Sequence, residues 1–161
     1  MVIDTIRKYA PQARIVIQQT WSYCNADARI CDKETRGPGF WGFDQLGMYE
    51  RLTANYSKLA AENGFEIIPT GKAVQLYRAR RPVMEVAEDA VGNFWKDENG
   101  VDHADTIHLN RDGEYLQACV WTAKLFGADV TKLATVPENL NTSANVTLLR
   151  ECARDAVAEG L

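Results

Sequence analysis

Several features that would indicate a particular class of protein are absent from this sequence. No apolar run approaches the roughly 18 residues that a membrane-spanning helix needs, and residues 1–9 lack the apolar core of a signal peptide. Lysine and arginine are scattered and the net charge is −4, so no basic surface for nucleic acid is predicted. The 161 residues, 46% of them hydrophobic, are sufficient for one domain with a sizeable core.

Cysteine is present but is not arranged as a metal-binding or redox motif. The four cysteines form no Cys-x-x-Cys pair. Cys119 lies on the apolar face of a predicted helix and is expected in the core, where free cysteine is common. Cys24 and Cys31 share one predicted loop. A disulfide between them stays open as an alternative to two free thiols, because sequence spacing does not establish bridge geometry.

Hydrophobic spacing predicts alternating helices and strands, and therefore an α/β fold with a parallel sheet. The predicted strands are residues 13–20 and 65–69. The predicted helices are residues 2–10, 44–63, 70–80 (capped by Thr70), 111–126 and 143–159 (capped by Ser143). A long loop covers 21–42, and 81–104 is expected to be irregular, with a turn at 97–100. Two strands make a marginal sheet, so further strands are expected to precede residue 1 in the complete domain.

The most informative segment is Asp105-Thr106-Ile107-His108-Leu109-Asn110, which we place where a loop enters a helix. An aspartate and a histidine three residues apart would share one helical face. The carboxylate would then hold Nδ1–H of the ring while Nε2 faces a site, as in the base half of a hydrolytic triad. The alternative is that Asp105 caps the helix and His108 is a surface or packing residue.

A family resemblance supports the first interpretation. Residues 105–116 resemble the last sequence block of the SGNH (GDSL-like) hydrolases, which close their triad with Asp-x-x-His before a helix. Residues 15–21 and 67–75, together with Met48, Tyr49, Tyr56, Leu59 and Ala60, are similar to an uncharacterised bacterial SGNH-like family. The resemblance covers roughly residues 1–127, which leaves 128–161 as a C-terminal helical extension of a single, partial domain.

The resemblance implies a fold and an activity. The implied fold is a flavodoxin-like three-layer α/β/α sandwich, here lacking its N-terminal strands. The implied activity is serine ester hydrolysis, on a carbohydrate, acetyl or other small ester, with Asp105 and His108 as catalytic residues and no cofactor. In that family the serine follows the first strand in a Gly-Asp-Ser or Gly-Asn-Ser block.

No serine of this chain lies in such a block. The three serines are Ser22, Ser57 within the long helix, and Ser143 at a predicted cap. The nucleophile and oxyanion hole are therefore expected from sequence not present here, and the free-standing chain should be nearly inactive. Ser22 is the one candidate nucleophile, because it follows a strand. Its neighbours are not the small residues that a sharp nucleophile turn favours, and a local hydrogen bond is the alternative role.

Substrate contacts are expected at the same end of the sheet. Trp21 and Tyr23 follow the first strand and would line a pocket; the alternative is a lid or core position. Gln75 and Arg78 follow the second strand and would reach the pocket mouth, with plain surface placement as the alternative. A second hypothesis for the whole chain is a non-catalytic α/β module that binds carbohydrate or another ligand through Trp21, Tyr23 and Trp41.

A metal centre is the remaining chemical alternative. Asp102, His103, Asp105 and His108 have residue types that bind metals, yet no His-Glu-x-x-His or Cys/His framework accompanies them. We therefore expect no metal, and we expect His103 in a solvated loop. The predicted partner is a small-molecule or carbohydrate ester, with neither nucleic acid nor a membrane.

Overall fold

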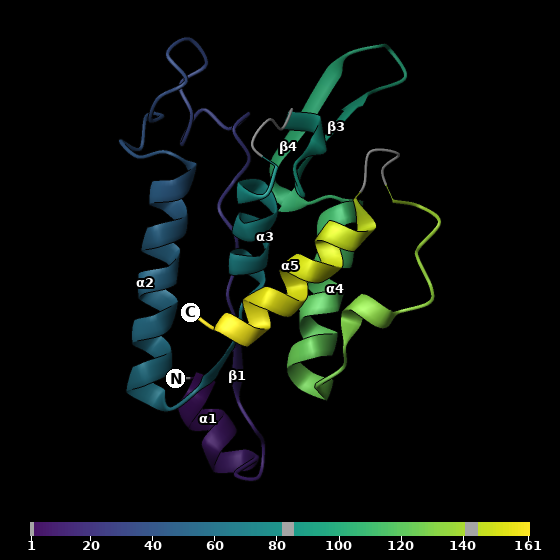
Figure 1. Ribbon diagram of the computed structural model, residues 1–161. Helices are drawn as coiled ribbons and strands as arrows, with labels where there is room; N and C mark the ends of the chain where they lie inside the picture. The colour runs from purple at the N-terminus through teal and green to yellow at the C-terminus, as the bar shows by residue number, and fades with distance from the viewer. Residues whose placement is uncertain (1, 82–85, 141–144) are drawn as a thin grey trace.

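The structure is a computed structural model that describes residues 2–81, 86–140 and 145–161. Its helices are α1 (Val2–Tyr9), α2 (Gln45–Asn63), α3 (Thr70–Ala79), α4 (Arg111–Phe126) and α5 (Val146–Glu159). Its strands are β1 (Val16–Gln18), β2 (Glu66–Ile68), β3 (Val91–Lys96) and β4 (Asp102–Leu109). The mixture confirms the predicted α/β class (Figure 1). Of the described helices, none is both long and apolar enough to cross a bilayer.

The parallel pair β1–β2 is held at its carboxyl end by one buried glutamine. The Gln19 side chain donates to Thr53 Oγ1 of α2 at 2.9 Å and accepts from the Lys72 amide of α3 at 2.9 Å. Gly71 lets α3 approach closely, since a Cβ there would lie 2.1 Å from the Thr20 carbonyl oxygen. The predicted strand 13–20 is correct in position, but only Val16–Gln18 pairs with β2.

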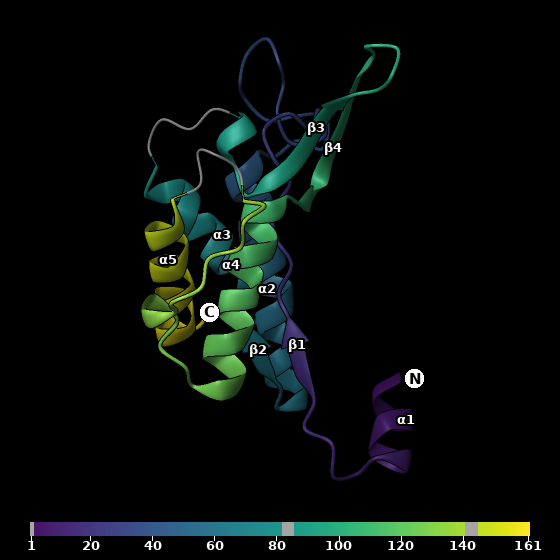
Figure 2. The same cartoon turned by 90° about the vertical axis from the view of Figure 1, so that its right-hand side faces the viewer.

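The core lies among α3, α4 and α5. Figure 2 shows these helices gathered on one side of β1 and β2, while α1 stands apart on the other. Their inward faces recur at helical spacing, as the sequence predicted for α4. The most deeply buried apolar residues are Ala73, Val74 and Tyr77 of α3, Leu116, Cys119 and Val120 of α4, and Leu149, Cys152, Ala153 and Ala156 of α5.

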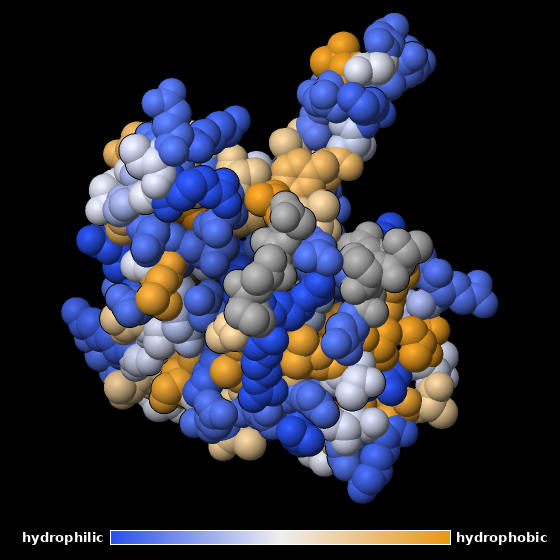
Figure 3. Space-filling view, turned by 45° about the horizontal axis from the view of Figure 1, so that its top comes forward, coloured by the Kyte–Doolittle hydropathy of each residue, from blue (hydrophilic) through white to orange (hydrophobic). Residues whose placement is uncertain are grey.

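Residues 91–109 form a β-hairpin, so the prediction of an irregular segment over 81–104 is wrong there. The turn at 97–100 is correct: Asp97 Oδ1 accepts from the amides of Asn99 and Val101, both at 2.9 Å. Figure 3 shows the hairpin as an arm that stands clear of the body. Because solvent reaches both faces of the arm, its strands lack the alternation of polar and apolar residues that normally reveals a strand.

Helix ends were predicted with mixed success. Helices α2 and α4 end at residues 63 and 126, as predicted, and Gly64 and Gly127 follow them in the left-handed conformation. Thr70 is not a cap: it is the first residue of α3, and its buried Oγ1 has no hydrogen-bond partner among the described residues. Asn145 caps α5 by accepting from the Leu148 amide at 3.0 Å, whereas Ser143 lies outside the described residues.

All four cysteines are buried free thiols. Cys119 lies in the core, as predicted. Cys24 and Cys31 belong to the same loop but form no disulfide, so that alternative is wrong for this structure. Burial raises the pKa of Cys24, and it raises the pKa of Cys152 to about 11, so neither is set up as a nucleophile at neutral pH.

Candidate functional site

Asp105 and His108 are in direct contact. The distance from Asp105 Oδ2 to His108 Nδ1 is 2.7 Å, which is hydrogen-bond length. The other oxygen, Oδ1, accepts from the amides of Ile107 at 3.0 Å and His108 at 3.1 Å. Both carboxylate oxygens are thus engaged by Ile107 and His108, and the imidazole is held by one of its two nitrogens.

The local structure that produces this contact is not the predicted helix start. Both residues belong to β4, and the pairing pattern shows an irregularity there: Val91 pairs with Leu109 and Asn93 with Asp105. Residues 106–108 on β4 therefore oppose Gly92 alone on β3. Gly92 has a φ of 107°, which glycine adopts readily, and an added Cβ would lie 3.1 Å from Cys24 Sγ. This bulge turns the chain so that Asp105 reaches His108.

Helix α4 begins after the dyad and is capped by a different residue. Asn110 Oδ1 accepts from the amides of Asp112 at 3.1 Å and Gly113 at 3.2 Å. The Asn110 side-chain amide also donates to the carbonyls of Asp89 at 2.6 Å and Gly92 at 3.2 Å. The alternative role of Asp105 as a helix cap is therefore wrong, and Asn110 fixes the base of the hairpin instead.

The dyad combines a held carboxylate with an accessible ring. Although burial raises the pKa of Asp105, the hydrogen bonds from the Ile107 amide and from the ring and amide of His108 outweigh it and hold that pKa below its usual value. The Asp105 side chain is 29% exposed and that of His108 is 69% exposed. Within the described residues no group hydrogen-bonds Nε2, so this nitrogen is open to an incoming molecule.

The loop 19–44, which joins β1 to α2, forms hydrogen bonds to the part of β4 that carries the dyad. Trp21 donates its indole N–H to the Ile107 carbonyl at 2.8 Å, and the Cys24 amide donates to the Thr106 carbonyl at 3.1 Å. Thr106 also donates its hydroxyl to Asp27 at 2.6 Å. Trp21 therefore holds the strand that carries the dyad, which is a structural role, whereas the sequence predicted that it lines a pocket.

Asp27 is the charged residue in the contact between the loop 19–44 and β4. The hydrogen bond from the Arg29 guanidinium, opposed by burial and aided by the Thr106 hydroxyl, lowers the pKa of Asp27 to about 2. Arg29 and Asp27 form an ion pair at 2.6 Å. The charged form of Asp27 therefore ties the loop to β4 throughout the neutral range.

Ser22 is placed for structure and not for nucleophilic attack. It is buried, and its Oγ accepts from Arg78 Nη1 at 2.8 Å. Arg78 also donates to the carbonyls of Ser22 and Tyr23 and pairs with Asp89 at 2.8 Å. The cation occupies a lone pair of the serine oxygen and lowers its nucleophilicity, and no base is within reach of the hydroxyl among the contacts described.

Arg78 is buried in an ion pair, so its predicted place at a pocket mouth is wrong; for Gln75 that place stays a prediction. The side chains of Arg78 and Asp89 are each only 7% exposed, which makes them a buried ion pair between α3 and the segment before β3. The Gln75 side chain has a buried Oε1 without a hydrogen-bond partner in the described part of the chain. The spacing of Gln75 and Arg78 along α3 does not indicate whether their side chains point towards the interior or towards solvent.

Tyr23 belongs to an outward aromatic cluster on the loop 19–44. Its ring lies 5.9 Å from that of Trp41, whose ring lies 6.4 Å from Phe40 and 5.9 Å from Phe43. The Arg29 guanidinium lies 4.4 Å from the Tyr23 ring centroid and 5.1 Å from that of Trp41. Phe40 and Trp41 are exposed, so this cluster is a surface that a ligand can reach.

The hairpin carries a second aromatic surface, which the sequence did not indicate. His103 is not in a loop: it pairs with Trp95 across the hairpin, with ring centroids 5.5 Å apart and an interplanar angle of 16°. Asp102 pairs with Lys96 at 2.6 Å. Of the four residues considered as metal ligands, Asp102 thus pairs with Lys96, His103 with Asp97, and Asp105 with His108, and no cluster suited to a metal occurs among the described residues.

Comparison with known proteins identifies a family without an assigned activity. The model of the family described as "Domain of unknown function (DUF4886)" matches residues 1–156, and the chain belongs to this family. A solved DUF4886 family protein from Bacteroides uniformis has the same fold, with a TM-score of 0.69 and 23% sequence identity. The match covers 98% of this chain and 53% of that one, so the chain spans about half its length. No curated protein matches.

Proposed function

Starting from its membership of the DUF4886 family, we propose that this chain is the base-bearing part of an SGNH-type serine ester hydrolase. The single observation that carries the proposal is the 2.7 Å contact between Asp105 and His108 Nδ1, with Nε2 open. The order Asp-x-x-His before a helix, which the SGNH resemblance rests on, accompanies that geometry. A three-layer sandwich around it is part of the same proposal.

His108 is the proton carrier in the proposed reaction. Its Nε2 takes the proton of a serine hydroxyl as that oxygen attacks the ester carbonyl, and it then gives the proton to the departing alcohol. Water then attacks the acyl-enzyme while His108 takes its proton, and the acid is released as His108 returns that proton to the serine oxygen. Asp105 keeps Nδ1 protonated and stabilises the imidazolium that forms, a role for which its lowered pKa suits it.

The serine comes, in this proposal, from outside residues 1–161. Ser22 is held by Arg78, and Ser57 lies on α2. A nucleophile on a separate segment must reach the open side of His108, within about 3 Å of Nε2. The length of the solved relative, of which this chain matches 53%, supports the idea that DUF4886 proteins have room for such a segment.

Ester hydrolysis tests the proposal in the protein made from the complete reading frame that contains these residues. We expect it to hydrolyse p-nitrophenyl acetate and to react with a fluorophosphonate probe. His108→Ala should lower kcat on the order of 10⁴- to 10⁶-fold, as for other residues of a serine triad. Trp121→Ala, which changes an exposed residue of α4, is the control and should change kcat little. Absence of hydrolysis in the wild type, or unchanged kcat in His108→Ala, would contradict the proposal.

The second candidate is a ligand-binding module without catalysis. The observation that favours it is the exposed cluster of Tyr23 and Trp41 with Arg29, which combines rings with a charged hydrogen-bond donor. Trp21 does not join that surface, because its indole is bound to the Ile107 carbonyl. This candidate predicts ligand binding that Trp41→Ala removes, in a protein whose His108→Ala variant is indistinguishable from wild type in every ester assay.

A further inference from the structure

The dyad and the aromatic pair of Trp95 and His103 share one face of the hairpin, and the aromatic pair is the nearer of the two to the hairpin turn. Residues paired across an antiparallel ladder share a face, as do residues two apart on one strand. Trp95 pairs with His103, and Asn93 pairs with Asp105. Trp95, His103 and Asp105 therefore lie on the same face, and an extended molecule with its reacting bond at His108 would pass over the indole.

The aromatic pair is held in place before any ligand arrives. His103 covers one side of the Trp95 indole, and its ring nitrogen lies 3.1 Å from Asp97 Oδ2 in the hairpin turn. Trp95 nevertheless remains 51% exposed, on an arm that stands clear of the body (Figure 3). An immobilised, half-exposed ring loses little conformational entropy when it binds a partner.

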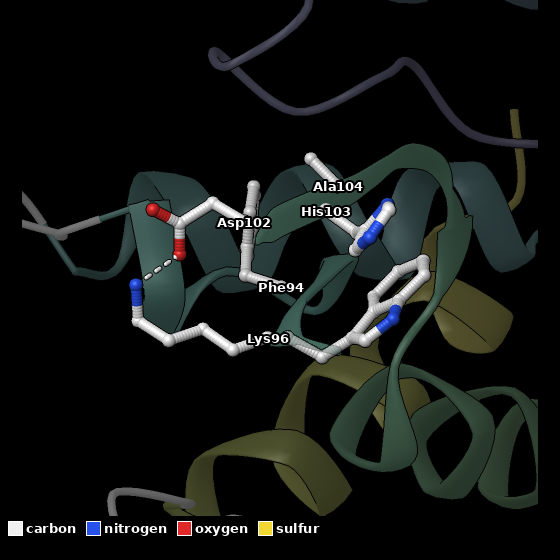
Figure 4. Close-up of a pocket in the computed structure, with 6 residues that line it drawn as sticks. Phe94, Lys96, Asp102, His103 and Ala104 are labelled. Atoms are coloured by element: carbon white, nitrogen blue, oxygen red, sulfur yellow. Dashed lines mark hydrogen bonds and ion pairs between the residues drawn. The ribbon is translucent and has the colours of Figure 1, made fainter. Parts of the chain in front are cut away.

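One carboxylate lies beside this ring, since Asp97 contacts His103, whereas the paired Lys96 and Asp102 belong to the opposite face of the hairpin. A cavity of about 470 Å³ lies along the hairpin and is lined by Phe94, Trp95, Lys96, Asp102, His103 and Ala104. Figure 4 shows its lining residues, with the Lys96–Asp102 ion pair at one side and the His103 ring at the other. An apolar ring face with the His103 imidazole and the Asp97 carboxylate beside it matches a sugar, which presents C–H groups on its faces and hydroxyls around its edge.

The spacing fits one sugar unit between the reacting bond and the ring. His103 and Asp105 are two positions apart, and a strand advances roughly 3.3 Å per residue, so the indole lies about 7 Å along the hairpin from Asp105. A six-membered ring whose ester is placed at His108 spans that interval. The exposed aromatic cluster on the loop 19–44 is not aligned with the dyad along a shared strand. For this reason the hairpin is the better-placed site.

We propose that Trp95, backed by His103, is a subsite that stacks a sugar ring of a carbohydrate ester substrate. The subsite deepens the proposed function and rests on it for the placement of the ester at His108. The sugar is recognised by its C–H face on the indole and by hydroxyl contacts to Asp97, whose carboxylate lies beside His103. Trp95 and Asp97 are specificity residues of the hairpin, separate from the dyad itself.

Binding of neutral oligosaccharides tests the subsite independently of catalysis. Titration of the ¹⁵N-labelled chain with xylotetraose and with cellotetraose should shift the Trp95 indole N–H resonance saturably, with a Kd on the order of 1 mM for at least one of them. Trp95→Ala should weaken binding at least about tenfold, which corresponds to 1.4 kcal/mol. Trp121→Ala removes another exposed tryptophan, on α4, and should leave the Kd unchanged.

The outcomes separate this inference from the proposed function. Absence of a saturable shift with both sugars, or equal Kd values for wild type and Trp95→Ala, would overturn the subsite. The same holds if the shift tracks protein concentration instead of sugar, which would mean that a second copy covers the hairpin. If His108→Ala binds sugar as the wild type does while no ester is hydrolysed by the complete protein, the subsite stands and the esterase proposal fails.

Discussion

The helices on the two sides of β1 and β2 differ in how much of their surface is buried. Helix α5 buries four residues in 14, and α4 buries seven in 16, including Leu116 and Val120. Helix α2 buries only Met48 and Ala60 in 19 residues, and α1 buries none. The dyad is attached to the packed half through β4 and α4, whereas the other half, α1 to α2, has apolar side chains in solvent.

This difference separates what holds the fold from what completes the site. Burial of apolar surface is the main stabilising term, so most of the stability should reside in α3, α4, α5 and the base of the hairpin. Exposed apolar residues on the other half include Val2, Tyr9, Leu46 and Leu59. In the proposed function, this half is where a further segment that carries the serine would pack.

The largest effect is expected from the buried ion pair of the packed half. Arg78→Ala leaves Asp89 buried without its cation and should lower the free energy of unfolding by about 3–5 kcal/mol. The exposed pair Arg14–Glu66, whose side chains are 55% and 49% exposed, provides the matched control. Arg14→Ala should cost about 1 kcal/mol or less in the same urea titration. If Arg78→Ala and Arg14→Ala lost equal free energy of unfolding, the contrast between the buried and the exposed ion pair would be wrong.

A core leucine should matter more than a leucine of the open half. Leu149→Ala removes a fully buried side chain of α5 and should cost about 2–5 kcal/mol. Leu46→Ala, in the half-exposed first turn of α2, should stay within about 0.5 kcal/mol of wild type. Thermal unfolding followed by circular dichroism measures both. A Leu46→Ala loss as large as that of Leu149→Ala would show that α2 is packed in solution.

Acid should loosen the contact between the loop 19–44 and the dyad strand. The pKa of Asp27 is about 2 in the folded chain and higher in the unfolded chain, so the unfolded state binds the proton first. The resulting stability, about 2 kcal/mol, is complete above pH ~4 and is lost as the pH falls towards 2. Asp27→Asn should abolish this part of the pH dependence, whereas the exposed Asp102→Asn should leave it. A wild-type curve that Asp27→Asn does not change would refute the assignment.

The smallest effects should appear in local opening. Amides of α1 and β1 are expected to exchange with deuterium faster than those of α4 and α5, since few buried contacts hold them. Exchange monitored by mass spectrometry gives the order directly. Protection of α1 equal to that of α5 would place both halves in one cooperative unit.

Features set by nearby residues were predictable from the sequence, and those set by distant residues were not. Gly64, Gly127 and the turn at 97–100 follow from local backbone preferences. The Asp105–His108 contact was anticipated, but through a helix, because no local pattern announces a bulge opposite Gly92. The bond from Arg78 to Ser22 joins residues 56 apart, and spacing within α3 could not indicate it. The catalytic role of the dyad and the sandwich fold stay predictions.

The protonation of His108 tests the central claim, that Asp105 prepares this ring as a base, most directly. A long-range ¹H–¹⁵N correlation spectrum, recorded about two pH units above the ordinary histidine pKa, distinguishes the two neutral tautomers. The account predicts that Nδ1 carries the proton and Nε2 is free, and that Asp105→Asn weakens this preference. A proton on Nε2 of His108 in the wild type would contradict the account, because that nitrogen could then not accept a proton from a serine.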